Sequence, residues 1–418
     1  MSRRKAPEPL PRVHWIHSTR LHVVMYSMLL VATPFLLMRN FLQPAILRFS
    51  RFGFEVAGTR VPIVPVLALV VLVGSLIAFR RYLTRIRVLA GVIVLLLNAL
   101  AQQVADYYFD HNFYDLQQNW HYFAYLTFCI MLYRDLAPRG VRKTRIMLIT
   151  FFLAVSFSTF DETVQLGISG RAFEMGDIAK DAWGSVMGIV LLYIGGSQPE
   201  ALRAQWRQVR HETLPGYLEN PASIATLLAV LGFLFVSFAS LLGERSHWYL
   251  TVLLTVGCFV LFFVLLHLSQ RRWVRYGLVT VLVAALGAQS YFFVKHRADY
   301  IMHNGPGLTV YKGIPAVFFD VMVFPDDTFR PVPKKHTFTY RDIKFFLKQE
   351  TDIILLGSGT HGRGGRGFPQ EARNQFMFNE FTKDGTQVII LPNSEACQAF
   401  NRLKSEGKNV LFILHNTC

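Results

Sequence analysis

The sequence predicts a polytopic α-helical membrane protein of about nine spans with a small C-terminal α/β domain of the β/β/α type. Of the 418 residues, 52% are hydrophobic and only 17% are charged, which excludes an ordinary soluble protein. The apolar residues gather into runs of about 18 to 22, the length that crosses a hydrocarbon core about 30 Å thick. After residue 294 these runs stop, and segments with the patterns of strands and helices alternate.

About nine apolar runs are expected to be membrane spans. They cover residues 21–38, 62–79, 88–104, 121–133, 146–160, 178–195, 224–243, 248–268 and 273–294. The first run follows a basic segment but precedes no small-residue cleavage site, so it is predicted to be an uncleaved helix rather than a signal peptide. The fourth and fifth runs are short, which is typical of tilted or re-entrant helices.

The net charge of +16 is explained by membrane topology rather than by nucleic-acid binding. Basic residues crowd between the predicted spans, in the segments RRYLTRIR, RDLAPRGVRKTR, LRAQWRQVRH and QRRWVR. Lys and Arg resist translocation, so these loops and the N-terminus are expected in the cytoplasm. The loop with Arg39, Arg48, Arg51 and Arg60 disagrees with this orientation, and its Phe and Leu content favours an amphipathic helix on the membrane surface.

Polar and ionisable residues concentrate near the outer ends of the third to sixth spans. We expect one shared polar site made of His121, Tyr125, Asp161, Glu162, Gln165, Arg171, Asp177 and Asp181. A carboxylate at the bilayer centre costs about 2.5 to 3.5 kcal/mol, so these groups must be paired, neutralised or close to the interface. Gly184 and Gly188 continue the stripe of Asp177 and Asp181, and are predicted to let a neighbouring helix approach closely.

The chemistry of this cluster leaves several roles open. It could bind a cation, hold a phosphate through Arg171, or shuttle protons through His121. No cofactor and no firm metal site is predicted, although the cluster could bind a divalent cation. The four Cys show neither the spacing of a metal site nor a disulfide framework. For any one residue of the cluster, the competing interpretation is that it pairs with another residue of the cluster and only fixes the helix packing. For the cluster as a whole we favour function, because ionisable groups inside a membrane usually mark a functional site.

The motifs that carry these residues are HYFAY, DETVQLGISGR and DIAKDAWGSVMG, within residues 88–196. They are similar to the pattern of the VanZ family, named after a teicoplanin-resistance protein. That pattern is a His-aromatic-x-x-Tyr helix start, an Asp-Glu-x-x-Gln helix end, a Gly-Arg turn and an Asp-x-x-x-Asp/Asn-x-x-Gly stripe. The resemblance implies a bacterial cell-envelope protein whose polar motif faces outward. Val164 stands where many members have a His, which puts in doubt any mechanism that needs two histidines.

The C-terminal segment opens with strand-like alternation and continues with a predicted helix in TYRDIKFFLKQE, where Thr339 is the expected N-cap. We then predict a strand in DIILLGSG, a helix over about 369–383, a strand in TQVIILP, a helix in SEACQAFNRLKSEG and a strand in NVLFIL.

A glycine-rich loop follows the strand in DIILLGSG, and its residues GSGTHG fit the spacing G-x-G-x-x-G. A dinucleotide site is not expected, because the next helix begins about seven residues too late and the following strand ends in Leu391-Pro392-Asn393 instead of an acidic residue. A mobile basic loop is the preferred interpretation. Arg363 and Arg366 would then contact an anion or a lipid headgroup.

The same region resembles a second family. The strand DIILLGSG, the Pro-opened segment at Pro369, VIILPNSEACQAFNRLKSEGKNVLFIL and the ending HNTC look like the Mth-type domain family, which includes an adipogenesis-associated protein and respiratory complex I assembly factors. The resemblance implies a mixed β/β/α fold used for protein contacts, with no established catalysis. Residues 362–367 depart from the family's shorter loop and put in doubt any ligand inferred from relatives.

These patterns predict four parts: an N-terminal transmembrane pair (1–87), a VanZ-like membrane domain (88–198), three further transmembrane helices (199–300) and an Mth-type domain (303–418). The expected location is the bacterial inner membrane. A count of nine spans places the C-terminal domain outside, while its relatives are intracellular, so its side of the membrane stays open.

Three functions are compatible with the sequence. The preferred one is binding of a lipid-linked or surface glycan or phosphate component at the outward cluster, with an effect on glycopeptide sensitivity. There Arg171 would contact an anionic group, while Glu162, Asp177 and Asp181 would position a cation or sugar hydroxyls. The alternatives are a metal-assisted lipid-phosphate hydrolase or transferase, and a membrane anchor that presents a protein-binding module. Membrane lipids, an envelope precursor and a protein partner of the C-terminal domain are the expected partners, and nucleic acid is not.

Overall fold

The computed structural model describes residues 45, 48–49, 52–56, 59–105, 116–167, 173–242, 247–360, 362, 364–368, 374–379 and 384–416. The chain divides into two compact units. One comprises Met1–Ala105, His111–Val236 and Cys258–Phe263, and the other comprises Asp106–Asp110, Ser237–Gly257 and Val264–Cys418.

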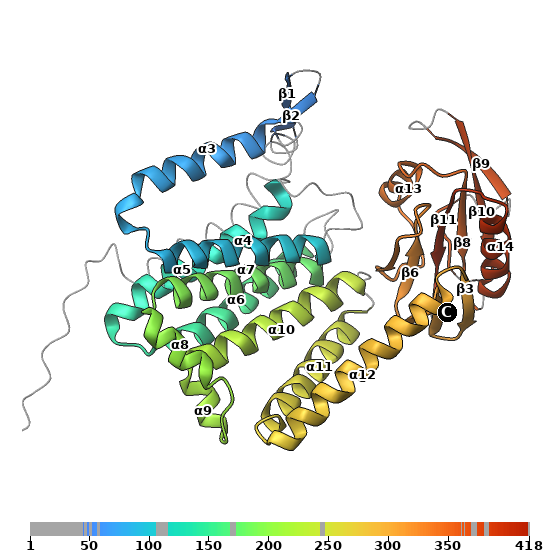
Figure 1. Ribbon diagram of the computed structural model, residues 1–418. Coiled ribbons are helices and arrows are strands. Elements are labelled where there is room, and N and C mark those ends of the chain that lie inside the picture. Colours follow the sequence, from blue (N-terminus) through green and yellow to red (C-terminus); the bar gives the residue numbers. More distant parts are fainter. Residues whose placement is uncertain are drawn as a thin grey trace, which may run out of the picture. The chain divides into compact units, whose positions relative to one another are not determined.

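Helices form most of the chain before residue 297 (Figure 1). They are α3 (Ile63–Ala78), α4 (Arg85–Ala105), α5 (Leu116–Leu136), α6 (Lys143–Gln165), α7 (Met175–Gly195), α8 (Pro199–Arg207), α9 (Leu214–Glu219), α10 (Pro221–Leu241), α11 (Trp248–Leu268) and α12 (Arg272–His296). A short antiparallel hairpin of β1 (Gly53–Val56) and β2 (Thr59–Pro62) precedes α3. The amphipathic helix expected around Arg48 lies largely outside the described residues, and the described residues 53–56 and 59–62 form the two strands of this hairpin instead.

Six of these helices are long and apolar enough to cross a membrane: α4, α6, α7, α10, α11 and α12. The apolar helix α3 has only 16 residues, and α5 has the necessary length of 21 residues but is less apolar because it carries polar and charged side chains. Helices therefore form at every expected span except the first, 21–38, which lies outside the described residues.

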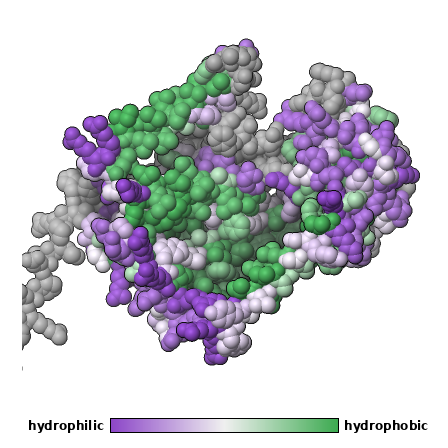
Figure 2. Space-filling model, in the orientation of Figure 1, coloured by the Kyte–Doolittle hydropathy of each residue, from purple (hydrophilic) through white to green (hydrophobic). Residues whose placement is uncertain are grey.

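Large apolar side chains cover the surface of these helices. Figure 2 shows hydrophobic residues over the helices and mostly hydrophilic residues over the C-terminal domain. On α12 the side chain of Val281 is 67% exposed and that of Leu286 is 59% exposed. Soluble proteins rarely expose contiguous apolar surface of this extent, because its contact with water is unfavourable.

The helix α7 forms the centre of the first unit, and 83% of an 18-residue apolar stretch of this helix is buried. It packs against α4, α5 and α6. Two glycines allow the approach to α5, because a methyl group at Gly184 would lie 2.7 Å from the carbonyl oxygen of Tyr122 and one at Gly188 would lie 2.5 Å from Cβ of Cys129. Neither distance leaves room for a side chain, so small residues at these positions set the α5–α7 distance.

The C-terminal domain contains a mixed sheet in the strand order β7-β6-β11-β8-β10-β9 and a smaller antiparallel sheet in the order β3-β4-β5. The strands are β3 (Ile301–Gly305), β4 (Leu308–Tyr311), β5 (Ile314–Val317), β6 (Asp320–Val323), β7 (Phe329–Val332), β8 (Ile353–Gly357), β9 (Asn374–Asn379), β10 (Asp384–Leu391) and β11 (Val410–Leu414). The helices are α13 (Tyr340–Leu347) and α14 (Asn393–Ser405). The central strands β8, β10 and β11 run parallel, whereas β6, β7 and β9 pair antiparallel.

The mixed sheet has a core on each face, as expected for strands that alternate their side chains. On one face Phe346 of α13 packs with Ile354 and Leu356 of β8. On the other face Phe400 of α14 packs with Leu355 and Phe412. All residues of β8 and β11 are buried, which is typical of central parallel strands covered on both sides.

Most elements predicted for this domain are confirmed, but one is wrong. Thr339 caps α13 through a capping box with Asp342, as expected. Of the helix predicted over 369–383, the described residues Asn374–Asn379 form an edge strand instead, because they pair antiparallel with β10.

The helix α12 passes almost directly into the domain, since β3 begins at Ile301. Gln289 of α12 donates a hydrogen bond to the carbonyl of Gly313, 2.9 Å away. Gly313 has a φ of +76° and leaves no room for a Cβ, because that atom would lie 2.7 Å from the carbonyl oxygen of Phe292. The turn between β4 and β5 therefore rests on the last turns of α12.

The carboxylate of Asp327 joins two distant parts of the domain. Nζ of Lys312 and Nζ of Lys404 each lie 2.7 Å from its oxygens. Partial burial acts to raise the pKa of Asp327, but the hydrogen bonds from both lysines outweigh it and hold the pKa below its ordinary value.

We predict that Gly184→Ala lowers the free energy of unfolding by about 1 to 3 kcal/mol, because the new methyl group overpacks the α5–α7 contact. The measurement is thermal unfolding of the purified chain in detergent, followed by tryptophan fluorescence. The matched control is Gly91→Ala on α4, where a Cβ would have no neighbour within 4 Å. Equal unfolding temperatures for the two variants would contradict the prediction.

We also predict that Asp327→Asn destabilises the chain at pH 7 by about 1 kcal/mol, since the charge on this partly exposed group is lost. Because the pKa of Asp327 is lower in the folded than in the unfolded state, its ionised form stabilises the fold at any pH above the unfolded-state pKa of about 3.9. This stabilisation disappears as the pH falls through the folded-state pKa. Unfolding temperatures of the two proteins should therefore converge in acid. The exposed Glu350→Gln serves as control, and a difference that persisted below about pH 2 would speak against the explanation.

Candidate functional site

Three helix ends meet to form a polar cluster in the first unit. The α5 and α7 helices contribute residues from their first turns, and α6 contributes residues from its last turns. Nδ1 of His121 lies 2.9 Å from Oδ1 of Asp181, and its Nε2 lies 3.7 Å from Oδ2 of Asp177. Asp177 and Asp181 are four residues apart on α7, so both face the imidazole. Ser158 of α6 donates a hydrogen bond of 2.6 Å to the second oxygen of Asp181.

A second group of contacts lies at the end of α6. Nε2 of Gln165 donates to Asp161 at 2.9 Å and to Glu162 at 3.1 Å. The other oxygen of Glu162 accepts a hydrogen bond of 2.8 Å from the backbone N–H of Glu174, just before α7. Glu162 is only 3% exposed, so its carboxylate holds the α6–α7 connection from the inside.

The structure adds residues that the sequence reasoning missed. Lys180 is buried, and its Nζ lies 3.5 Å from Oδ1 of Asp177, so it supplies a cation beside the cluster. Its position between Asp177 and Asp181 on a predicted membrane helix was a signal for such a role. Ser158 could have been found as well, because it precedes Asp161 by three residues and shares its helix face.

A further polar contact joins α4 and α5. The side chains of Gln102 and Asn98 both donate to Oδ1 of Asn119, at 2.7 and 3.3 Å. Nε1 of Trp183 on α7 donates to the carbonyl of Leu97 at 3.0 Å. These hydrogen bonds satisfy polar groups that would otherwise be buried among apolar side chains, and they fix α4 against α5 and α7.

Arg171 and Tyr125 are the two remaining predicted site residues. Arg171 lies outside the described residues. Tyr125 lies one helical turn beyond His121, in an apolar group with Phe128 and Leu132, and its ring meets Phe128 edge-on at 6.1 Å. We therefore assign Tyr125 to the packing of α5.

The cluster is acidic within the described residues. Four carboxylates, from Asp161, Glu162, Asp177 and Asp181, face the cationic or titratable groups His121 and Lys180. Oδ1 of Asp161 is buried and accepts no hydrogen bond from a described residue. An unsatisfied acceptor beside an excess of carboxylates suits a ligand with hydroxyl or ammonium groups. Among the described residues, no group of three His, Cys, Asp or Glu side chains has an arrangement that would hold a metal ion.

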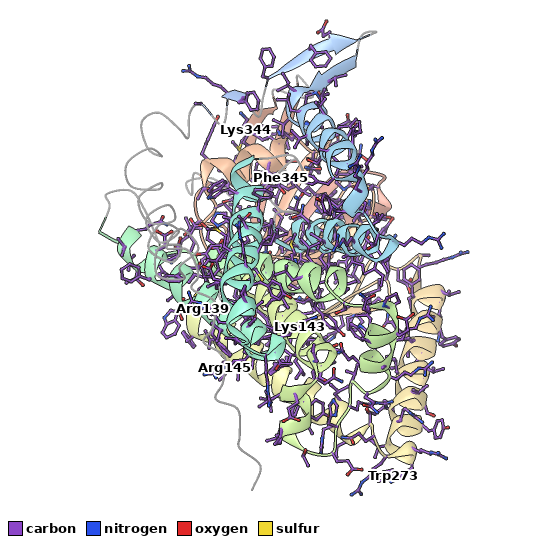
Figure 3. All side chains as sticks on the ribbon, turned by 90° about the vertical axis from the view of Figure 1, so that its left-hand side faces the viewer. Arg139, Lys143, Arg145, Trp273, Lys344 and Phe345 are labelled. Atoms are coloured by element: carbon purple, nitrogen blue, oxygen red, sulfur yellow. The ribbon has the colours of Figure 1, made fainter. Side chains whose placement is uncertain are left out.

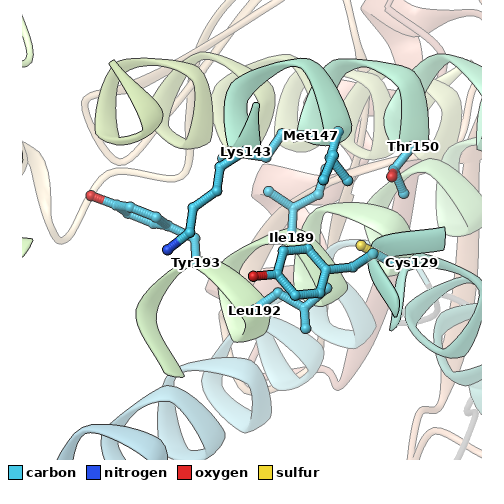
Figure 4. A pocket seen from close by; sticks show the side chains of 9 residues that line it. Cys129, Lys143, Met147, Thr150, Ile189, Leu192 and Tyr193 are labelled. Carbon is cyan, nitrogen blue, oxygen red and sulfur yellow. The ribbon is translucent and has the colours of Figure 1, made fainter. Parts of the chain in front are cut away.

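The opposite end of the same helices has different chemistry. A small cavity between α5, α6 and α7 is lined by Cys129, Tyr133, Lys143, Ile146, Met147, Thr150, Ile189, Leu192 and Tyr193 (Figure 4). Most of these side chains are apolar, and Lys143 donates to the carbonyl of Gly196 at 3.4 Å. The cavity lies at the start of α6, more than two helical turns from the polar cluster, and shows no arrangement of catalytic groups.

A basic groove lies at the connection between α5 and α6. It is lined by Arg139, Arg142, Arg145, Leu148, Leu218 and Glu219, among others. Figure 3 shows Arg139, Lys143 and Arg145 at this connection. The start of α6 is thus basic, whereas its end is acidic.

The glycine-rich loop of the C-terminal domain does not form a dinucleotide site in the described residues. The next described element after β8 is the strand β9 rather than a helix, so the N-terminus that would receive a pyrophosphate is missing there. Arg363 lies outside the described residues. Arg366 is exposed, and its backbone N–H donates to the carbonyl of His336 at 3.1 Å.

We predict that His121→Ala lowers the free energy of unfolding by about 3 to 5 kcal/mol, because it leaves the buried Asp181 without its main partner. Adding Asp181→Asn should recover part of the loss, since the remaining amide carries no charge. The measurement is a double-mutant cycle on thermal unfolding in detergent. Thr127→Ala, which removes only a hydroxyl bonded to Phe123 of its own helix, is the control. Strictly additive effects would refute the coupling.

Comparison with known proteins identifies only the C-terminal region. Residues 304–415 match the model of a family described as a protein of unknown function, DUF498/DUF598. The chain also resembles two solved structures, each with a TM-score of 0.23 over 28% of this chain and 98% of the other. One, titled MT938, is 23% identical, and the other, a conserved hypothetical protein from Pyrococcus horikoshii OT3, is 22% identical.

No curated protein matches the chain. The VanZ-like resemblance of residues 88–196 is not supported by a family model and rests on its motifs. The family match thus identifies the C-terminal domain as a DUF498/DUF598 domain.

Proposed function

We propose that this chain is a multi-pass membrane protein of the VanZ-like type whose polar cluster binds a lipid-linked or surface glycan component of the bacterial cell envelope. The observation that carries the proposal is the buried carboxylate of Asp181, which is hydrogen-bonded to both His121 and Ser158, with Asp177 on the other side of His121. Ionisable groups placed among apolar helices are expensive and therefore indicate a site of function.

The distribution of charge supports the proposed orientation. The basic groove with Arg139, Arg142 and Arg145 lies at the start of α6, and the acidic cluster lies at its end. Basic loops stay in the cytoplasm, so a membrane-spanning α6 would present the cluster on the outer side. The six apolar helices and the exposed apolar surface of α12 support the membrane location.

The ligand chemistry follows from the hydrogen-bonding groups of the cluster. Carboxylates only accept hydrogen bonds, and the four of this cluster outnumber its two cationic or titratable groups, His121 and Lys180. Sugar hydroxyls would donate to Asp177 and to the unsatisfied oxygen of Asp161. In this proposal Lys180, together with Arg171 of the neighbouring segment, would contact the phosphate of a lipid-linked glycan. His121 lies between two carboxylates and would carry a proton between them.

The two alternative functions have less support. A metal-assisted lipid-phosphate hydrolase needs a ligand set, and the described residues offer no three metal-binding side chains in a suitable arrangement. A membrane anchor that presents the C-terminal domain to a protein partner fits the family match of residues 304–415, but gives the buried ionisable cluster no role.

We predict that Glu162→Gln and Asp177→Asn abolish any change in teicoplanin sensitivity that the wild-type chain confers on a susceptible bacterial host. The physical reason is the loss of a charged acceptor for a sugar hydroxyl, while the size of each side chain is kept. The measurement is the minimal inhibitory concentration, together with mass spectrometry of glycolipids that copurify with the chain.

The control is Glu200→Gln, an exposed carboxylate of α8 outside the cluster. All variants must accumulate in the membrane at the wild-type level. Cluster variants that accumulate normally and still confer the wild-type sensitivity and glycolipid content would end the proposal.

A further inference from the structure

The C-terminal domain has a second cluster of buried polar residues at the carboxyl ends of its parallel strands. β11, β8 and β10 end side by side, with Leu414 and Leu391 both paired to Gly357. His415 follows β11, the glycine-rich loop follows β8, and Asn393 follows β10 after Pro392. In sheets with parallel strands, ligands bind at this edge because loops and helix starts converge there.

The topology places a carboxylate opposite the histidine. β6 pairs antiparallel with β11, and Leu414 lies opposite Val321, so Asp320 and His415 are brought together. Nδ1 of His415 is hydrogen-bonded to Oδ2 of Asp320. Oδ1 of Asp320 accepts from the backbone N–H of Asn416 at 3.0 Å, and Nζ of Lys334 lies 3.7 Å away.

These contacts determine which nitrogen of His415 carries the proton. As a carboxylate, Asp320 can only accept, so Nδ1 of His415 must be the donor. In the neutral ring Nε2 then has a free lone pair. His415 is 4% exposed, and its Nε2 is buried with no hydrogen-bond partner among the described residues. Burial of an unsatisfied acceptor is costly unless a ligand completes it.

His415 is one of the residues that line a cavity of about 10 Å³, which is near the lower limit for one hydroxyl-sized group. The lining is mostly apolar and includes Val332, Pro333, Phe338, Leu356, Ile413 and Gly365. Lys335 also lines it, with its Nζ held 2.8 Å from Asp342.

Glycines of the loop lie directly over the histidine. A methyl group at Gly364 would lie 3.2 Å from Cδ2 of His415 and 3.1 Å from the carbonyl oxygen of Ser358. Asn393 holds both sides of the edge, since its Oδ1 accepts from the N–H of Gly359 at 2.9 Å and its Nδ2 donates to the carbonyl of His415 at 2.7 Å. A side chain at Gly364 would therefore crowd the imidazole of His415.

We propose that this edge is a ligand site in which Asp320 positions His415, and Nε2 of His415 accepts a hydrogen bond from the hydroxyl group of a small, otherwise apolar ligand. The proposal is independent of the membrane cluster. The lining is mostly apolar, and its two charged side chains are already paired, Asp320 with His415 and Lys335 with Asp342. The size of the cavity admits only the hydroxyl end of the ligand. Asp320 is a positioning residue, while His415 is the group that touches the ligand.

The first test uses methanol as the probe on the full-length chain with ¹⁵N-labelled histidine in detergent. Methanol should shift the Nε2 signal of His415 in a saturable manner, because it donates a hydrogen bond. Acetonitrile, which is of similar size but has no hydroxyl, should not. The proposal would be overturned if both probes changed the Nε2 chemical shift equally and without saturation, or if neither probe changed it.

The second test reverses the roles of the ring nitrogens. In Asp320→Asn, Oδ1 would keep the hydrogen bond from Asn416, so Nδ2 would face Nδ1 of His415 as a donor. The proton would then move to Nε2, as in the aspartate-to-asparagine change described for the serine protease triad. We expect a protonated Nε2 in the ¹⁵N spectrum and about tenfold weaker methanol binding. An unchanged tautomer with unchanged binding would exclude the positioning role.

A third test leaves His415 and Asp320 unchanged and compares substitutions at two glycines. Gly364→Ala should weaken methanol binding by about tenfold or more, because the new methyl group crowds His415. Gly385→Ala in β10 is the matched control, since its methyl group would meet only the ring of Phe376 at an ordinary distance of 3.5 Å. Equal binding by the two variants would show that the probe does not reach the imidazole past Gly364, and would contradict the proposal.

Discussion

The first unit depends on one constraint, which is that a carboxylate surrounded by apolar helices must meet a hydrogen-bond donor. Asp181 satisfies it with donors from two other helices, His121 on α5 and Ser158 on α6. These contacts fix the rotation of all three helices at one end, because each side chain must point inward. The glycines of α7 then determine how closely α5 can pack. Polar pairing and small-residue packing therefore specify the same arrangement.

The sequence predicted the helices well because their signal is a long apolar run, which is local and independent of tertiary contacts. The main error in the C-terminal domain arose at the segment that became β9. Its neighbour along the chain is a glycine-rich loop, and the strand is defined by pairing with β10 rather than by its own composition. An edge strand of six residues has too few alternating positions to be distinguished reliably from a loop or a helix.

The polar site was predictable in part for a related reason. Four-residue spacing on α7 placed Asp177 and Asp181 on one face, and the cost of isolated charges required partners, for which Arg171 was expected first and His121 second. The structure describes the pairing with His121, while Arg171 lies outside the described residues. Lys180 was missed although its partner Asp177 lies three residues earlier on the same helix. The amides that join α4 to α5 could not be placed, because their partners depend on how the helices rotate against each other. The meeting of Asp320 with His415 was also beyond the sequence. The two residues are 95 positions apart, and only the pairing of β6 with β11 brings them together.

The direct passage of α12 into the C-terminal domain limits where that domain can act. Only four residues, 297–300, separate the helix from β3, and the β4–β5 turn rests on the helix through Gly313. With α12 in a bilayer, the domain has no tether on which to swing away. A partner that is itself confined to the membrane would meet the domain by a two-dimensional search whose rate depends on lipid composition and lateral mobility, whereas a soluble partner would have to reach it at the membrane surface.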